Sequence, residues 1–142
     1  MERVLFDSSV YIAGFRIGGD VVAALGRHAA VWLSSVVLEE LYAGTNERSR
    51  YAVEQLERDF SKVGRIAVPN LSDWAGTGKV LARLAAKYGY EQIGRGRLTN
   101  DALIAMSAGR LQITVITANA RDFARLAEFR SFAWRVDRVG SN

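Results

Sequence analysis

The chain of 142 residues contains no cysteine and only one histidine, His28. The absence of cysteine excludes a disulfide framework, thiolate zinc sites, iron–sulfur ligation and thiol catalysis. A single histidine excludes a multi-histidine metal site and leaves almost no route to a Ser-His-Asp triad. Any metal ion bound by this chain would therefore need oxygen ligands.

Long apolar runs are also missing. The longest uncharged stretches, Ala29–Leu38 and Leu111–Ala120, have ten residues each, whereas a membrane-spanning helix needs about 20 apolar residues. The N-terminal residues show no cationic segment followed by a long apolar one, which is the pattern of a secretory signal. Together with the lack of cysteine, these features predict a cytoplasmic protein without a membrane partner. The length predicts a single domain spanning residues 1–142.

Charge is unevenly placed along the chain. Residues 1–60 hold six basic and nine acidic side chains, whereas residues 61–142 hold thirteen basic and six acidic ones. Sixteen of the nineteen basic residues are arginine, the side chain best shaped for bidentate phosphate contacts. This pattern indicates a nucleic-acid partner, although codon usage in a GC-rich genome would account for the arginines equally well.

Hydrophobic patterning alternates short apolar runs with amphipathic segments. The apolar runs predict strands near residues 4–6, 30–33, 65–68, 113–117 and 131–136. The amphipathic segments predict helices near residues 9–15, 21–28, 35–43, 47–63, 73–88, 100–109 and 121–128. Their expected capping residues are Ser8 or Ser9, Asp20, Ser34 or Ser35, and Ser72. Strands separated by helices require crossover connections, so we expect a three-layer α/β/α sandwich with a mainly parallel central sheet.

Four acidic residues fall where such a sheet gathers functional groups, beyond the carboxyl ends of its strands. Asp7 ends the first strand, Glu40 lies in the helix after the second, Asp101 opens the helix before the fourth, and Asp122 follows the fourth. Each acid alone has a plain structural explanation, such as a helix cap or a favourable place at a helix N-terminus. Glu40 is the exception, because it follows an apolar stretch and precedes Leu41.

Clustered carboxylates would raise one another's pKa and destabilise the fold unless a cation relieved the repulsion. Oxygen ligands of this kind suit Mg²⁺ or Mn²⁺. Such an ion activates water and stabilises negative charge on a phosphate. Four carboxylates suit two divalent ions, or one ion with basic neighbours.

Four segments together resemble the motifs of PIN-domain nucleases, in the family's order and across nearly the whole chain. These segments are Leu5–Ile12, Ser34–Gly44, Thr99–Ala105 and Thr117–Phe123. In the second motif the pattern Glu-Leu-x-x-Gly selects Glu40 over Glu39. Asp7, Glu40 and Asp101 match the metal ligands of the family. The fourth motif departs from it, because Asn119 stands where many relatives have Asp.

The resemblance implies a Mg²⁺- or Mn²⁺-dependent endoribonuclease similar to VapC toxins, with RNA as substrate. It also implies a homodimer and a cognate, VapB-like antitoxin protein that covers the site. The fourth ligand is then either Asp122 or, more weakly, Asn119, and Thr117 orients a ligand or a water molecule. Arg95 and Arg97, a few residues before Asp101, are expected to hold the RNA backbone, unless they belong to a solvated loop.

Two other functions are compatible with these residues. A catalytically silent module would bind RNA or protein through the same fold, although a binding module gains nothing from a repulsive acidic cluster. A DNA-directed nuclease would use the same four acids. An adjacent reading frame for a small antitoxin would favour the ribonuclease.

Overall fold

The computed structural model describes residues 1–93 and 97–137 and contains a five-stranded parallel sheet with the order β3-β2-β1-β4-β5. The strands are β1 (Glu2–Phe6), β2 (Ala29–Ser34), β3 (Ile66–Ala67), β4 (Thr114–Thr117) and β5 (Trp134–Val136). The central strand β1 pairs with β2 on one side and with β4 on the other. The prediction of a mainly parallel sheet is confirmed.

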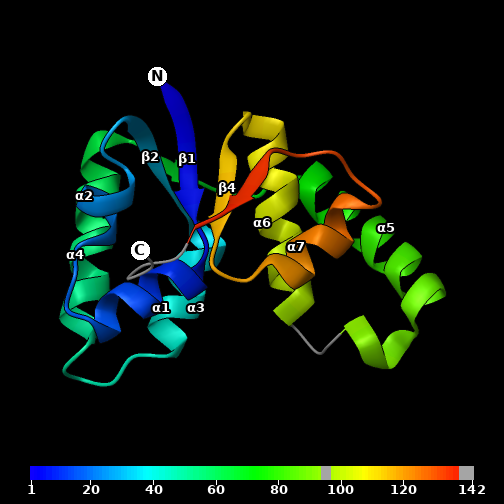
Figure 1. Ribbon diagram of the computed structural model, residues 1–142, viewed down its shortest axis with the longest axis horizontal. Helices are drawn as coiled ribbons and strands as arrows, with labels where there is room; N and C mark the ends of the chain where they lie inside the picture. The colour runs from blue at the N-terminus through cyan, green and yellow to red at the C-terminus, as the bar shows by residue number, and fades with distance from the viewer. Residues whose placement is uncertain (94–96, 138–142) are drawn as a thin grey trace.

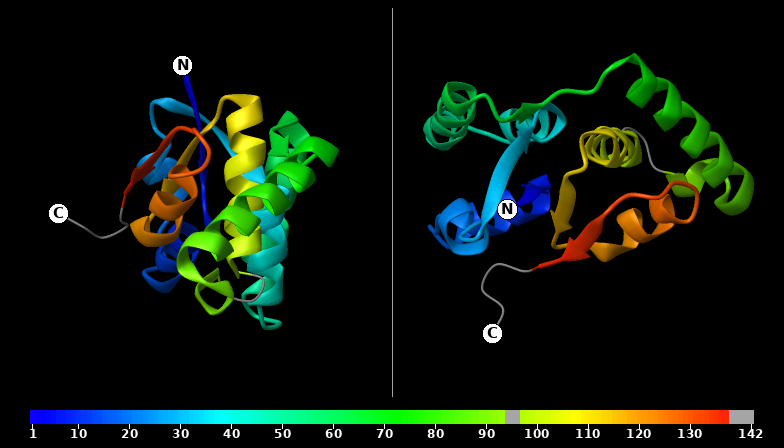
Figure 2. Two further views of the ribbon diagram at one scale, coloured as in Figure 1. Left: turned by 90° about the vertical axis from the view of Figure 1, so that its right-hand side faces the viewer. Right: turned by 90° about the horizontal axis from the view of Figure 1, so that it is seen from above.

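Seven α-helices and one short 3₁₀ helix surround this sheet in the described residues. They are α1 (Ser8–Arg16), α2 (Val21–Leu25), α3 (Ser35–Ala43), α4 (Arg50–Val63), α5 (Leu71–Tyr88), η1 (Tyr90–Ile93), α6 (Arg97–Leu111) and α7 (Ala120–Ala127). In Figure 1, α2 and α4 lie to the left of the strands and α5, α6 and α7 to the right. The view from above in Figure 2 shows the same division. The fold is the predicted α/β/α arrangement.

The apolar character of β1 explains its central place. Val4, Leu5 and Phe6 are fully buried, as expected for a strand that is covered on both faces. The strand ends at Asp7, whose backbone N–H still donates to the carbonyl of Ile116 on β4. The carboxyl ends of β1 and β4 therefore lie side by side, and β1 points toward α1 and α3 in Figure 1.

Three helix starts differ from the sequence-based prediction. Asp7, rather than Ser8 or Ser9, caps α1, and Asn70, rather than Ser72, caps α5 through a capping box with Asp73. In both cases a carboxylate or amide oxygen takes the capping position, and the serine side chain donates to that oxygen instead. Helix α6 starts at Arg97, so Asp101 lies in its second turn and not in the first.

The remaining differences are small. Strands β3 and β5 are shorter than predicted, because only two and three residues pair with their neighbours at the edges of the sheet. The caps predicted at Asp20 and at Ser34 are confirmed. None of the helices in residues 1–93 and 97–137 is both long enough and apolar enough to cross a membrane.

Candidate active site

Asp7 occupies the point where β1 turns into α1, and its side chain is held from three directions. As the N-cap of α1 it accepts the backbone N–H of Val10 at 3.4 Å. Its Oδ2 accepts the hydroxyl of Thr117 at 2.6 Å, and its Oδ1 accepts the hydroxyl of Ser9. With only 5% of the residue exposed, the carboxylate has a single fixed orientation at the end of the sheet.

The two hydroxyls that bind Asp7 also tie α1 to the turn that follows β4. Ser9 Oγ accepts the N–H of Ala118 at 3.1 Å, and Thr117 Oγ1 accepts the N–H of Asn119 at 3.0 Å. The family resemblance implies an orienting role for Thr117, whereas the sequence predicts only a helix cap for Ser9. The sequence signal for a contact between Ser9 and Asp7 is the position of Ser9, two residues after an acid at the end of a buried strand.

Glu40 extends from α3 toward the same end of the sheet. It is half-buried, and its Oε1 is buried without a hydrogen-bond partner among the described residues. Burial raises its pKa above the ordinary value, and the charges of Asp7 and Glu39 raise it further. The polar side chains of Asn100 and Ser8 lower the pKa of Glu40. Because the charge of Asp7 acts on the Glu40 carboxyl, these two predicted site residues lie within electrostatic range of each other.

Asp101 is on α6, the helix that packs against α3. The residue is 8% exposed. Its neighbour Asn100 lowers the pKa of Glu40 and donates from Nδ2 to Glu39 Oε1 at 3.5 Å. Asp101 thus lies one residue beyond the side chain that links α6 to the two glutamates.

The fourth motif is arranged differently from the other three. Asn119 caps α7, and its Oδ1 accepts the N–H of Arg121 at 3.3 Å. Asp122 is in the first turn of α7 and is partly exposed, and no hydrogen bond or ion pair joins it to Asp7 or Glu40 among the described residues. In the part of the chain that the structure describes, no group of three or more Asp, Glu, His or Cys side chains is arranged to hold a metal ion.

The two arginines expected to contact RNA fall outside this description. Arg95 lies outside the described residues. Arg97 begins α6, but its side chain is likewise outside them. The structure therefore leaves their RNA-binding role as a prediction.

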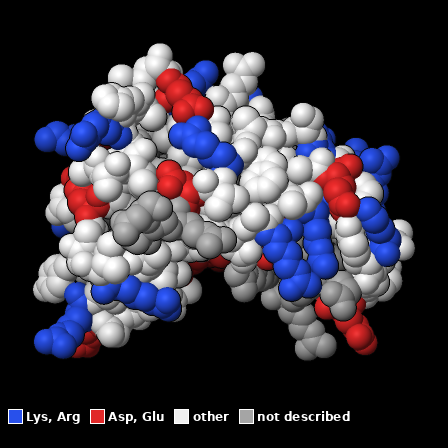
Figure 3. Space-filling model, in the orientation of Figure 1, with Lys and Arg blue, Asp and Glu red and all other residues white. Residues whose placement is uncertain are grey.

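The surface around the carboxyl ends of the strands is hollowed and carries both signs of charge. Figure 3, in the orientation of Figure 1, shows a notch at the lower edge between the two halves of the molecule, with acidic atoms at its top. Basic side chains lie to the right of this notch.

Burial of the acidic pair predicts a pH-dependent stability for the metal-free protein. Desolvation raises the pKa of Asp7 above 3.8 and that of Glu40 above 4.5, despite the hydrogen bonds that lower the pKa of Asp7. Their contribution to stability is complete below these unfolded values and is lost as the pH rises through the higher folded values. We expect the free energy of unfolding of a Glu40→Gln variant to exceed that of the wild type by a margin that widens from pH 4 to pH 8.

The measurement is urea unfolding in EDTA at each pH, on both proteins. The Glu128→Gln variant is the matched control, because the salt bridge of Glu128 with Lys87 lowers its pKa. A margin for Glu40→Gln that stays constant over this range would contradict the raised pKa.

Comparison with known families identifies the fold. The family model for the PIN domain matches residues 4–129, which include Asp7, Glu40, Asp101 and Asp122. The chain belongs to the PIN-domain family. PIN domains are a family of nucleases. No curated protein matches the chain closely enough to be counted as a relative.

Solved structures share the fold of this PIN domain over almost its whole length. DNA-bound VapBC from Salmonella typhimurium has a TM-score of 0.70 at 21% identity and covers 96% of this chain and 98% of its own. VapBC-1 from nontypeable Haemophilus influenzae has a TM-score of 0.63 at 24% identity, covering 94% and 96%. VapBC-5 from Mycobacterium tuberculosis, of the VapBC family of toxin–antitoxin systems, has a TM-score of 0.56 at 24% identity, covering 98% and 100%.

Proposed function

We propose that this PIN domain is a metal-dependent endoribonuclease and the toxin of a VapBC-type toxin–antitoxin pair. The observation that carries the proposal is the buried, unpartnered Oε1 of Glu40 beside the fixed carboxylate of Asp7. A buried oxygen that lacks a donor costs free energy. A cation at this place would satisfy that oxygen and relieve the repulsion between the two acids.

The chemistry of these donors suits Mg²⁺ or Mn²⁺, which prefer carboxylate oxygens. Asp7 and Glu40 would hold the ion, with Asp101 as a third ligand and Asp122 or Asn119 as a fourth. Such an ion, when bound, supplies an activated water and stabilises charge on the phosphate. Thr117 and Ser9 keep the Asp7 carboxylate from rotating, and the partial burial of Glu40 limits competition from bulk water.

The proposal predicts cleavage of a structured RNA pool by the purified protein with Mg²⁺ or Mn²⁺, and no cleavage with EDTA. Attack by water would leave 5′-phosphate and 3′-hydroxyl ends, which end-labelling can identify. Single-stranded DNA of matched length separates a ribonuclease from a DNA-directed nuclease. Lack of cleavage with either metal, from folded protein free of any partner, would contradict the proposal and favour a silent binding module.

A groove formed by the first, second and fourth helices supports the antitoxin partner. It has a volume of about 820 Å³ and lies between α1, α2 and α4, with Phe15, Val22, Leu56 and Val63 among its apolar residues. Phe15 is 38% exposed and Val63 60% exposed. Apolar side chains of an amphipathic helix bind grooves of this kind. The homodimer implied by the family resemblance stays a prediction.

We expect Val63→Glu to weaken the binding of the antitoxin at least tenfold, because the new charge would be buried by the apolar face of the partner helix. Val63 is the last residue of α4 and is exposed, so the fold tolerates the charge. The measurement is inhibition of cleavage by the product of an adjacent small reading frame. Tyr51→Glu, an exposed change on the same helix but outside the groove, is the control. Equal inhibition of both variants would exclude this groove as the docking site.

A further inference from the structure

An exposed tryptophan lies close to the acidic pair but takes no part in it. Trp74, in the first turn of α5, is 56% exposed. It lines a small pocket of about 250 Å³ together with Val68 and Pro69, and Glu39 and Asn100 contribute polar groups to the same pocket. The pocket thus combines a flat aromatic and apolar surface with a carboxylate and an amide.

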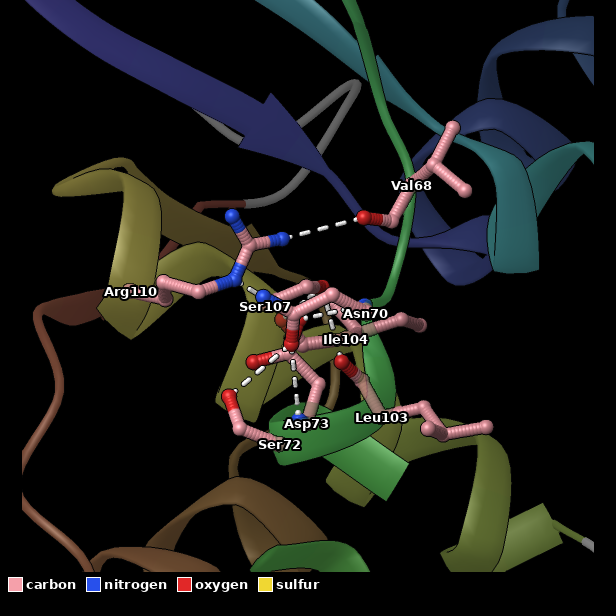
Figure 4. A network of polar contacts seen from close by, with 8 residues as sticks. All are labelled: Val68, Asn70, Ser72, Asp73, Leu103, Ile104, Ser107 and Arg110. Atoms are coloured by element: carbon pink, nitrogen blue, oxygen red, sulfur yellow. Dashed lines mark hydrogen bonds and ion pairs between the residues drawn. The ribbon is translucent and has the colours of Figure 1, made fainter. Parts of the chain in front are cut away.

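The segment that carries Trp74 is firmly anchored. Figure 4 shows Asp73 at the centre of a polar network that joins α5 to α6. Its Oδ2 accepts the N–H of Asn70 at 2.9 Å and the Nε of Arg110 at 3.0 Å. Arg110 also donates from Nη2 to the carbonyl of Val68 at 3.0 Å. The backbone that carries the aromatic side of the pocket is therefore fixed, which reduces the entropy lost on binding a ligand.

The polar side of the pocket is continuous with the candidate active site. Glu39 precedes Glu40 on α3, and Asn100 precedes Asp101 on α6. The Asn100 side chain contacts Glu39 and also lowers the pKa of Glu40. A ligand group bound in this pocket would therefore lie next to a ligand group bound at the acidic site.

We propose that this pocket binds an unpaired guanine of the RNA substrate, stacked on Trp74 with its Watson–Crick edge toward Glu39; the proposal rests on the ribonuclease function above. Proteins recognise single-stranded RNA by stacking bases on aromatic side chains and by hydrogen bonds to the base edges. An ionised carboxylate only accepts hydrogen bonds. Guanine presents two adjacent donors on that edge, N1–H and the N2 amino group, whereas adenine presents only its N6 amino group there.

The test measures binding in EDTA, so that it does not depend on cleavage. The probes are two fluorescein-labelled uridine hexanucleotides, one with a central guanosine and one with a central adenosine. We expect the guanosine probe to bind roughly 5- to 150-fold more tightly, the discrimination typical of a bidentate contact. Glu39→Gln should remove most of this preference. Trp74→Ala should weaken binding roughly 5- to 150-fold, the usual effect of losing one stacking aromatic.

We expect the guanosine probe to quench the fluorescence of Trp74 when it binds. Trp74→Phe keeps a stacking ring, so this variant should retain most of the affinity but lose that quenching. Tyr51→Ala removes an exposed aromatic side chain from another helix and serves as the control. Equal affinity for the two probes, or an affinity that Trp74→Ala leaves unchanged, would overturn the proposal that this pocket binds guanine, even if the protein cleaves RNA. Absence of cleavage with the guanosine preference intact would overturn only the proposed function.

Discussion

Replacing Asp7 by Asn is expected to reduce RNA cleavage on the order of 10³-fold or more at neutral pH, and Glu40→Gln to do the same. Each change removes one negative charge from the candidate site, where the charge of Asp7 raises the pKa of Glu40. The proposed metal ion would need that charge to supply several kcal/mol of transition-state stabilisation, and each 1.4 kcal/mol is tenfold in rate. Initial rates of cleavage of a labelled RNA in Mg²⁺ measure the loss.

The fold should survive both changes. An Asn at position 7 keeps an oxygen that accepts from Val10 and Ser9, and the Thr117 hydroxyl can donate instead to the carbonyl of Asn119, 3.1 Å away. Since burial raises the pKa of both acids, the neutral side chains should hold or increase the melting temperature in EDTA. A gain of about 1 kcal/mol would raise it by about 4 °C.

The matched control is Asp20→Asn, which makes the same chemical change at the cap of α2, far from the acidic pair in sequence. It should leave the rate of cleavage within a factor of two or so of the wild type. Retention of cleavage by both Asp7→Asn and Glu40→Gln would place the chemistry elsewhere on the molecule.

Asp73→Ala is expected to destabilise the protein by about 3 kcal/mol, which corresponds to a fall in melting temperature of about 10 °C. Asp73 is 3% exposed and accepts both the Arg110 Nε and the N–H of Asn70. Its loss breaks the capping box of α5 and leaves the guanidinium without its carboxylate. Arg110 is partly exposed, so water partly compensates and the loss stays below that of a fully buried pair.

Thermal and urea unfolding measure this effect. Asp73→Asn keeps an acceptor for the N–H of Asn70 but loses the charge, so it should fall between Asp73→Ala and the wild type. The control is Glu2→Ala, which removes an ion pair with Arg135 whose two side chains are half-exposed; it should cost less than about 1 kcal/mol. A loss for Asp73→Ala no larger than that of the control would show that the network does not hold α5 in place.

The pattern of strands and helices predicted where the first two acids lie in the fold. Asp7 follows a run of buried residues that forms β1, and Glu40 lies on the helix after β2, as the structure confirms. Their role in catalysis stays a prediction. The same pattern gave the parallel sheet and most helices. The positions of these acids and of the strands and helices depend on patterns within a few residues, which a single sequence displays fully.

What the sequence could not give depends on contacts between distant segments. Ser9 was overlooked as a site residue because its hydrogen bond with Ala118 joins positions far apart in the chain. The predicted Ser72 cap is wrong for a local reason: Asn70 and Asp73, three residues apart, form a capping box that starts the helix earlier. Asp122 matched the fourth motif, yet no hydrogen bond or ion pair in the described structure links it to the acidic pair.

The hydrogen bond between Thr117 and Asp7 spans 110 positions of the chain. During synthesis, the Asp7 carboxylate is made 110 positions before the Thr117 hydroxyl that orients it and well before the β4 strand beside it. At about 5–20 residues per second, this interval lasts several seconds or more. The acidic site of the nascent chain is therefore completed only when β4 has joined the sheet.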